Sequence, residues 1–247
     1  MRPTLLALLS AVLLHAQWKL PASTPDLNAP PPKAADGKPD LSGIWEQDSM
    51  THFRDLTSDM KPGDVPWRPE AKALRASRAD GARGLEEPDA NCLPQGVPKI
   101  NAAPVPFKIV QTPKQIAMIY EFAHATRNIP MDGSPHLEGY PETWMGDSRG
   151  RWEGNTLVVD VTNFKPETWL DGAGNFHSSK LHVVERYTRT APATLRYEAT
   201  IEDPEVFDRP WTIRMDLSQR TERNAQLVEH ECERDAQGVY RHPPQFR

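Results

Sequence analysis

Short segments in which apolar and polar residues alternate constrain the fold of this chain more than any other feature. They recur from residue 107 almost to the C-terminus, and turns rich in Gly, Pro or Asn separate them. In residues 194–202, for example, Leu195, Tyr197 and Ile201 lie on one side of an extended chain, and polar residues lie on the other. Because the side chains of a β-strand alternate between two faces, each such segment predicts a strand with one buried and one solvated face.

The predicted strands form an antiparallel arrangement. No helical segment long enough to connect parallel strands falls between them, so the sequence argues against a parallel α/β sheet. We therefore predict an all-β fold, an antiparallel meander that forms a barrel or a sandwich behind a Pro-rich N-terminal extension. The predicted strands are residues 107–111, 116–121, 155–162, 181–189, 194–202, 211–217 and 226–233.

The N-terminal residues have the pattern of an export signal followed by a linker. An early arginine precedes a ten-residue apolar run that is too short to span a bilayer and is followed by the small residue Ala16. We predict a signal peptide over residues 1–16, a Pro-rich linker over 17–40 and a single β-rich domain over 41–247. The alternative is a buried N-terminal helix. A periplasmic or secreted location follows from the first interpretation.

The region between the linker and the first strands is less regular. Residues 69–79 predict a short surface helix, because Pro69 and Glu70 stand in its first turn and arginines stand near its end. The sequence leaves open whether residues 41–106 add strands to the barrel or cover it.

The chain has two cysteines, Cys92 and Cys232. In an exported protein, a pair of this kind predicts a disulfide, which here would close a loop of about 140 residues. Two buried thiols or one reactive thiol are the alternatives. Neither cysteine belongs to a CxxC pair, so the sequence gives no support for a zinc site or for thioredoxin-type chemistry.

The charge and the missing motifs exclude several functions. Acidic residues outnumber basic ones by 34 to 29, so the chain lacks the positive charge that nucleic-acid binding requires. No segment after the N-terminal run is apolar enough to cross a membrane, and the histidines lack metal-site spacing. The sequence also lacks a phosphate loop, a GxGxxG fingerprint and a GxSxG elbow. We predict no metal, no cofactor and a small-molecule ligand or substrate; the oligomeric state stays open.

The segment of residues 144–155 is the densest in glycine, tryptophan and charge. One interpretation is a hairpin turn that leads into the strand at residues 155–162, with its charged side chains paired across the turn. The other is a loop at the mouth of a barrel, in which a tryptophan forms a platform and charged residues form polar contacts. The candidate ligand-binding residues of this segment are Trp144, Asp147, Arg149, Trp152 and Glu153.

Glu185 is a charged residue on an apolar strand face. It shares that face with Leu181, Val183 and Tyr187, so its carboxylate is predicted to point into the core. An unpaired buried charge is unfavourable, so the carboxylate must be paired, hydrated or protonated. It belongs either to a buried ion pair, with Arg127, Arg149 or Arg214 as the partner, or to a pocket where it acts as a general acid or base.

The catalytic interpretation needs partners for Glu185. The candidates are His177, in the loop before the strand, as its proton-transfer partner, and Arg149 as an anion stabiliser. Glu121 ends another predicted strand and is a further candidate for the ligand-binding site. Two carboxylates in one cavity would push their pKa values apart, so that one could act as the acid and the other as the base.

Several of these motifs resemble those of a group of exported bacterial proteins without an assigned activity. The resemblance rests on residues 40–45 (DLSGIW), 146–154 (GDSRGRWEG) with 156–159 (TLVV), and 183–187 (VVERY), and it covers most of residues 40–233. In that group Cys232 is often followed by His-Glu-Gly-Asn, whereas this chain has Glu-Arg-Asp. A weaker similarity to calycin-type, lipocalin-like barrels implies the same barrel fold.

Two functions fit these features. An exported barrel that binds an apolar or aromatic small molecule predicts an apolar cavity with few titratable groups. A cofactor-free acid and base enzyme, such as a lyase, isomerase, hydratase or hydrolase, predicts a histidine and a carboxylate within hydrogen-bond reach in that cavity. A purely structural envelope protein would have a filled interior. Fold alone does not decide among them, and we favour ligand binding.

Overall fold

The computed structural model describes residue 26, residues 28–79, residue 83 and residues 86–230, together with residues 232–234 and 240–241. The predicted signal peptide and much of the predicted linker lie outside these residues.

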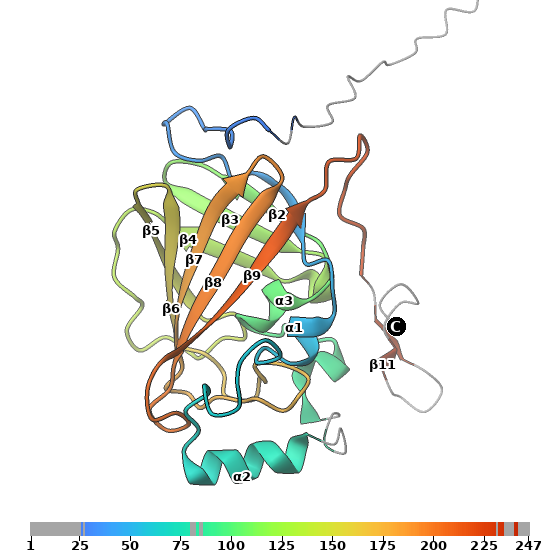
Figure 1. Ribbon diagram of the computed structural model, residues 1–247, viewed down its shortest axis with the longest axis vertical. Coiled ribbons are helices and arrows are strands. Elements are labelled where there is room, and N and C mark those ends of the chain that lie inside the picture. The colour runs from blue at the N-terminus through green and yellow to red at the C-terminus, as the bar shows by residue number, and fades with distance from the viewer. Residues whose placement is uncertain are drawn as a thin grey trace, which may run out of the picture.

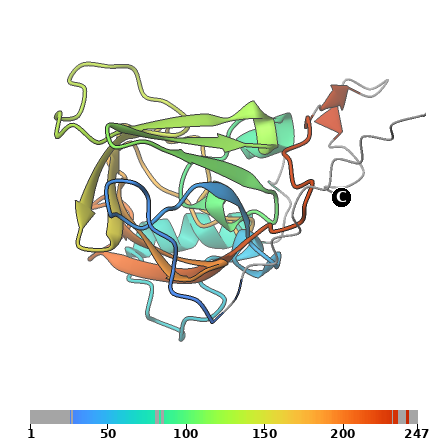
Figure 2. The same ribbon diagram turned by 90° about the horizontal axis from the view of Figure 1, so that it is seen from above.

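The described residues contain a nine-stranded antiparallel sheet that curls into a nearly closed barrel, as the sequence predicts (Figure 1). Neighbouring strands pair in the order β4-β3-β2-β1-β9-β8-β7-β6-β5. Viewed from above, β2–β4 lie on one side of the barrel and β7–β9 on the opposite side (Figure 2). The strands are β1 (Gly43–Glu46), β2 (Phe107–Gln111), β3 (Gln115–Tyr120), β4 (Thr126–Pro130), β5 (Asp147–Glu153), β6 (Thr156–Thr162), β7 (His182–Ala191), β8 (Thr194–Glu202) and β9 (Trp211–Gln219).

The barrel closes where its two end strands, β4 and β5, face each other, and we call this junction the seam. The Nε of Arg127 on β4 donates a hydrogen bond to the hydroxyl of Ser148 on β5 at 3.0 Å. The backbone of Gly150 lies so close to β4 that an added Cβ would stand 2.7 Å from Cγ2 of Ile129. Side-chain contact therefore joins the two edges.

Alternation along the strands produces the core, as predicted. On β7 the buried positions are Val183, Glu185, Tyr187 and Arg189, and the positions between them are partly exposed. The same pattern runs along β8 and β9. Burial of these apolar side chains is the main favourable term in the stability of the barrel.

Residues 41–106 take both of the roles that the sequence left open. They supply β1, which joins the sheet between β2 and β9, and they supply most of the segments that cover one end of the barrel. The predicted helix is confirmed as α2, which lies beyond that end (Figure 1). The helical segments are α1 (Thr51–Arg54), α2 (Pro69–Arg78), the 3₁₀ turn η2 (Pro88–Asn91), α3 (Lys99–Ala102) and the 3₁₀ turn η3 (Phe122–His124).

The predicted disulfide is also confirmed. Cys92 and Cys232 are bonded, and their Cα atoms lie 6.3 Å apart. The bond ties the segment after η2 to the C-terminal segment, which ends in a small ribbon of β10 (Glu233–Arg234) and β11 (Tyr240–Arg241).

Two predictions about strands are wrong. Residues 226–230 form no strand, because Val228 is exposed and the segment follows the barrel surface, where its backbone N–H bonds the Glu121 carboxylate. Residues 147–153 are neither a turn nor a loop but strand β5 itself. Only Gly154 and Asn155 form the turn that leads into β6.

Candidate functional site

A cluster of polar side chains lies in the middle of the barrel, around the carboxylate of Glu185. This carboxylate points inward as predicted and is fully buried. Its Oε1 accepts hydrogen bonds from the hydroxyls of Tyr187 at 2.9 Å and Tyr197 at 2.8 Å, and from Nδ2 of Asn101 at 3.0 Å. Arg127 donates to both carboxylate oxygens, so the two form a buried ion pair.

We call Glu185 and its four partners, Asn101, Arg127, Tyr187 and Tyr197, the Glu185 cluster. Further contacts hold these side chains in place. Asn101 comes from α3, whose residues are all buried at the covered end of the barrel. Its Oδ1 accepts a hydrogen bond from Tyr120 at 2.9 Å, and its Nδ2 also donates to the Tyr187 hydroxyl at 2.8 Å. Three strands, β4, β7 and β8, and one helix therefore meet at a single carboxylate, and β3 joins them through Asn101.

The electrostatics of the cluster favour fixed protonation states. Burial, followed by the charge of Glu185, raises the pKa of Tyr187 and of Tyr197 well above the ordinary value, so both phenols stay protonated donors. Burial lowers the pKa of Arg127, but the charge of Glu185, the neighbouring Tyr187 and Tyr120, and the hydrogen bond to Glu185 together outweigh it, and the net shift is upward. The cluster is thus a charge-balanced, hydrogen-bonded unit rather than an exposed acid or base.

An open pocket of about 400 Å³ lies at the seam, next to the Glu185 cluster, and we call it the seam pocket. Arg127 belongs to its lining, so the cluster and the pocket share one side chain. Trp144 and Met145 add apolar surface, while His124 and Thr143 add polar groups. The lining consists of Pro94, residues 123–128 and residues 143–146.

Two local features single out this pocket. Ala123 and His124 both have left-handed backbone angles, with φ of 52° and 49°. Residues other than glycine take such angles at an energetic cost, and such residues concentrate at functional sites. Among the described residues, the hydroxyl oxygen of Thr143 has no hydrogen-bond partner, and it is buried beneath the surface of the pocket wall.

The candidate residues of segment 144–155 separate in the structure. Trp144 lines the seam pocket, and Lys165 stacks on its ring at 4.7 Å. Asp147 and Arg149 form an ion pair of 2.7 Å on the outer face of β5. Trp152 is partly buried against the core, with Lys38 at 6.0 Å from its ring, and Glu153 is exposed and paired with Arg151 and Arg186.

The proposed partners of Glu185 lie elsewhere. Both ring nitrogens of His177 have other neighbours, the Thr168 hydroxyl at 2.6 Å and the Ser178 carbonyl at 2.8 Å. The structure therefore does not join His177 to Glu185, and Arg149 is on the outer surface. Burial lowers the pKa of His177 below its usual range, so a neutral imidazole that donates from Nδ1 fits this site.

Glu121 also lies apart from the Glu185 cluster. It follows β3 and accepts a hydrogen bond from the backbone of Val228 at 2.8 Å. Burial raises its pKa, and that hydrogen bond opposes the shift. The sequence left open whether Glu121 and Glu185 share a cavity, and their described contacts are separate.

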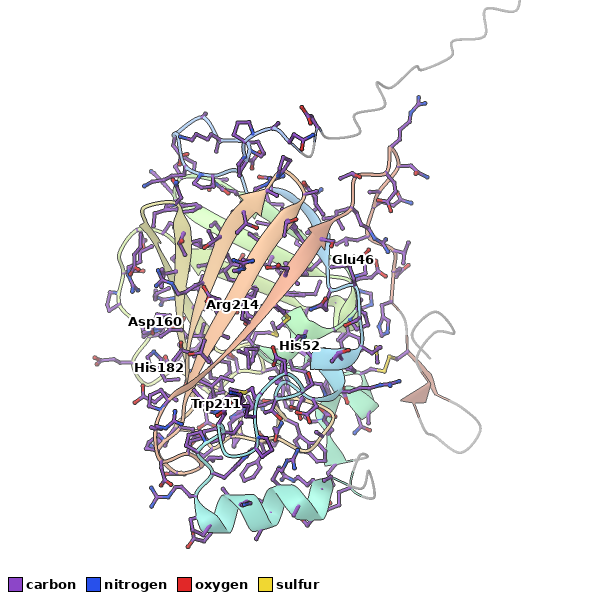
Figure 3. All side chains as sticks on the ribbon, viewed as in Figure 1. Glu46, His52, Asp160, His182, Trp211 and Arg214 are labelled. Carbon is purple, nitrogen blue, oxygen red and sulfur yellow. A yellow bond between two sulfur atoms is a disulfide. The ribbon has the colours of Figure 1, made fainter. Side chains whose placement is uncertain are left out.

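Sequence reasoning missed a chain of ionisable groups on the outer face of β5–β7. His136 contacts Asp147 through Nδ1 at 2.8 Å and Asp160 through Nε2 at 2.9 Å. His182 reaches the same Asp160 oxygen at 3.1 Å, and Figure 3 shows these two side chains together. These contacts of His136 hold connection 131–146 against the barrel wall.

Within the described residues, no group of three or more His, Cys, Asp and Glu side chains is arranged to hold a metal ion. No described helix has both the length and the apolar character that a membrane crossing requires.

Comparisons with known proteins add little to the site. No protein-family model matches the sequence, and no curated protein matches it. A solved structure with a similar chain path is a secretary abundant heat soluble (SAHS) protein from Ramazzottius varieornatus. It is 11% identical, the match covers 73% of this chain and 95% of that one, and the TM-score is 0.35. We base no inference on this likeness, and the resemblance to an exported bacterial group stays a prediction.

Proposed function

We propose that this protein binds a small neutral molecule with an apolar or aromatic body, and that the seam pocket is the binding site. The observation that supports this most is the position of the pocket. It lies against the Glu185 cluster, and its wall has both an aromatic face, Trp144, and an exposed imidazole, His124. Its volume falls in the range of sites that hold small organic molecules.

The charge of the pocket argues for a neutral ligand. Arg127 is the buried charge at its floor, and Glu185 already balances it through two contacts. An anion would have to compete with a buried carboxylate for the same guanidinium, which is unfavourable in a region of low dielectric. A ligand that packs on Trp144 and hydrogen-bonds the exposed His124 needs no such exchange.

Turnover by an acid and base mechanism has weaker support. That mechanism needs a carboxylate and a histidine that reach the same ligand. Glu185 is completely buried behind Arg127 and the tyrosines, and His177 is engaged with Thr168 and Ser178. We therefore propose binding rather than catalysis, by a mature protein that is exported with its disulfide formed.

The test uses the fluorescent probe N-phenyl-1-naphthylamine, which is neutral and aromatic. Saturable binding to the oxidised protein is expected, with about tenfold lower affinity for Trp144→Ala because an aromatic anchor is lost. Tyr140→Ala is the matched control, since Tyr140 lies in the same connection, is 60% exposed and does not line the pocket.

The proposal fails if the probe does not bind, or if Trp144→Ala and Tyr140→Ala bind it equally well. Urea unfolding of both variants shows whether they remain folded. Native mass spectrometry of the protein after incubation with a bacterial extract would then identify the chemical class of the natural ligand.

A further inference from the structure

A second pocket lies outside the barrel, between helix α2 and residues 57–67, and we call it the α2 pocket. Its volume is about 580 Å³, which also suits a small organic molecule. Figure 1 shows α2 beyond the covered end of the barrel. The α2 pocket shares no lining residue with the seam pocket, so the two are separate sites.

The charged side chains that line the α2 pocket are all cationic: Lys61, Lys72 and Arg75. This runs against the net charge of the chain, which is −5. Among the described residues, neither lysine amine belongs to an ion pair, and the nearest acid to Arg75 is Asp55, at 3.9 Å. The pocket therefore has a local excess of positive charge that favours an anion.

Arg75 is held in a fixed orientation toward this pocket. Its Nε donates a hydrogen bond of 3.0 Å to Oδ1 of Asn175. Asn175 is fully buried and in turn bonds the Asp171 carboxylate. Nη2 of Arg75 lies 3.9 Å from Oδ2 of Asp55, and no described hydrogen bond engages Nη1, so Nη1 is the nitrogen left to donate to a carboxylate or phosphate.

Another part of the pocket lining is apolar. Trp67 is partly buried and packs against Phe207, with ring centroids 4.7 Å apart, and against Phe176 at 5.9 Å. Met60 and Val65 extend this surface. An aromatic surface and cationic side chains in one pocket suit a ligand that has a flat apolar body and an anionic end.

We propose that the α2 pocket binds a small organic anion, in which a carboxylate or phosphate is held by Lys61, Lys72 and Arg75 and a planar apolar body packs on Trp67. This site takes a ligand of different charge from the seam pocket, and neither proposal depends on the other.

Isothermal titration calorimetry of the oxidised full chain with phenyl phosphate and with benzoate tests this site. The variant Lys61→Gln/Lys72→Gln is expected to bind both about tenfold more weakly, because two charge-assisted contacts are lost. Lys114→Gln is the matched control, since Lys114 is exposed in the β2–β3 turn and lies outside the pocket. Trp144→Ala is expected to bind phenyl phosphate like the wild type.

Three results would overturn the proposal. The first is that neither phenyl phosphate nor benzoate binds. The second is that the double lysine variant binds these anions with the same affinity as the wild type. The third is equal affinity for inorganic phosphate and phenyl phosphate, which would mean that charge alone attracts the ion. Because the seam pocket is tested with a neutral probe and Trp144→Ala, failure at one site is distinguishable from failure at the other.

Discussion

Replacement of Glu185 by glutamine tests whether the buried ion pair stabilises the barrel. The two side chains have nearly the same shape, so the change removes a charge rather than volume. Arg127 would then remain charged and buried without the carboxylate that balances its charge. Breaking a buried pair in this way costs about 3–5 kcal/mol.

Hydrogen-bond geometry points in the same direction. Oε1 of Glu185 accepts from four donors and Oε2 from Arg127. A glutamine amide therefore places its NH₂ group against at least one donor, whichever way it is turned. The double variant Arg127→Met/Glu185→Gln removes the unpaired charge, and we expect it to be more stable than Glu185→Gln alone.

Urea unfolding of the oxidised protein measures these differences. The matched control is Glu198→Gln, which breaks a pair with Arg214 at the barrel surface and should change the free energy of unfolding by less than about 1 kcal/mol. A loss of less than about 1 kcal/mol for Glu185→Gln would refute the reasoning, because an uncompensated buried charge costs more than this. The reasoning would also be refuted if the double variant lost the sum of the free energies of unfolding that the two single substitutions lose, since groups in direct contact are coupled.

Three other changes have expected results. Gly150→Ala should lower the free energy of unfolding by about 1–3 kcal/mol, because the new Cβ overlaps Ile129 across the seam; a urea midpoint like that of the wild type would contradict the close contact. Replacing Cys92 and Cys232 by serine should lower the free energy of unfolding by up to about 5 kcal/mol, because the loop is no longer constrained. An unchanged urea midpoint after reduction of the disulfide would contradict this expectation. Since the pKa of His177 is lowered on folding, the unfolded chain takes up a proton first, so stability should fall as the pH falls below about 6.5. His177→Gln should flatten that part of a pH series of urea midpoints, and an unchanged slope would count against it.

The sequence predicted those strands whose inward faces are apolar. Glu185 was correctly expected to point inward because apolar neighbours on the same face defined that face, and Arg127 was among the partners considered. The pairing of Arg127 with Glu185 depends on which distant strands lie next to each other in the barrel. The alternation of residues along one strand carries no information about that. Asn101 gave no signal, since it enters the barrel from a single turn of helix outside the repeating pattern.

The prediction missed three strands of the barrel, β1, β4 and β5, and one physical reason explains β4 and β5. The inward positions of β4 are Arg127 and Ile129, and those of β5 include Ser148 and Gly150. A strand whose inward face is charged, small or polar has no hydrophobic period to detect. Segment 226–230 shows the opposite error, because an alternating pattern there reflects no buried face.

Residues of β4 and residues 143–146, which lead into β5, line the seam pocket, and their place beside two missed strands has a cause. Large apolar residues on β4 and β5 would close the seam as tightly as the rest of the barrel. Small and polar residues at those positions bring the edges together through Arg127 instead, and leave a concave surface beside it. Arg127 can occupy the seam only because Glu185 balances its charge from inside the barrel. The same ion pair therefore accounts for the burial of the cluster and for the weak sequence signal of β4, and it is the basis on which we propose a neutral ligand for the seam pocket. The α2 pocket has no such internal counter-charge on its lysines, so its preference is expected to be for an anion.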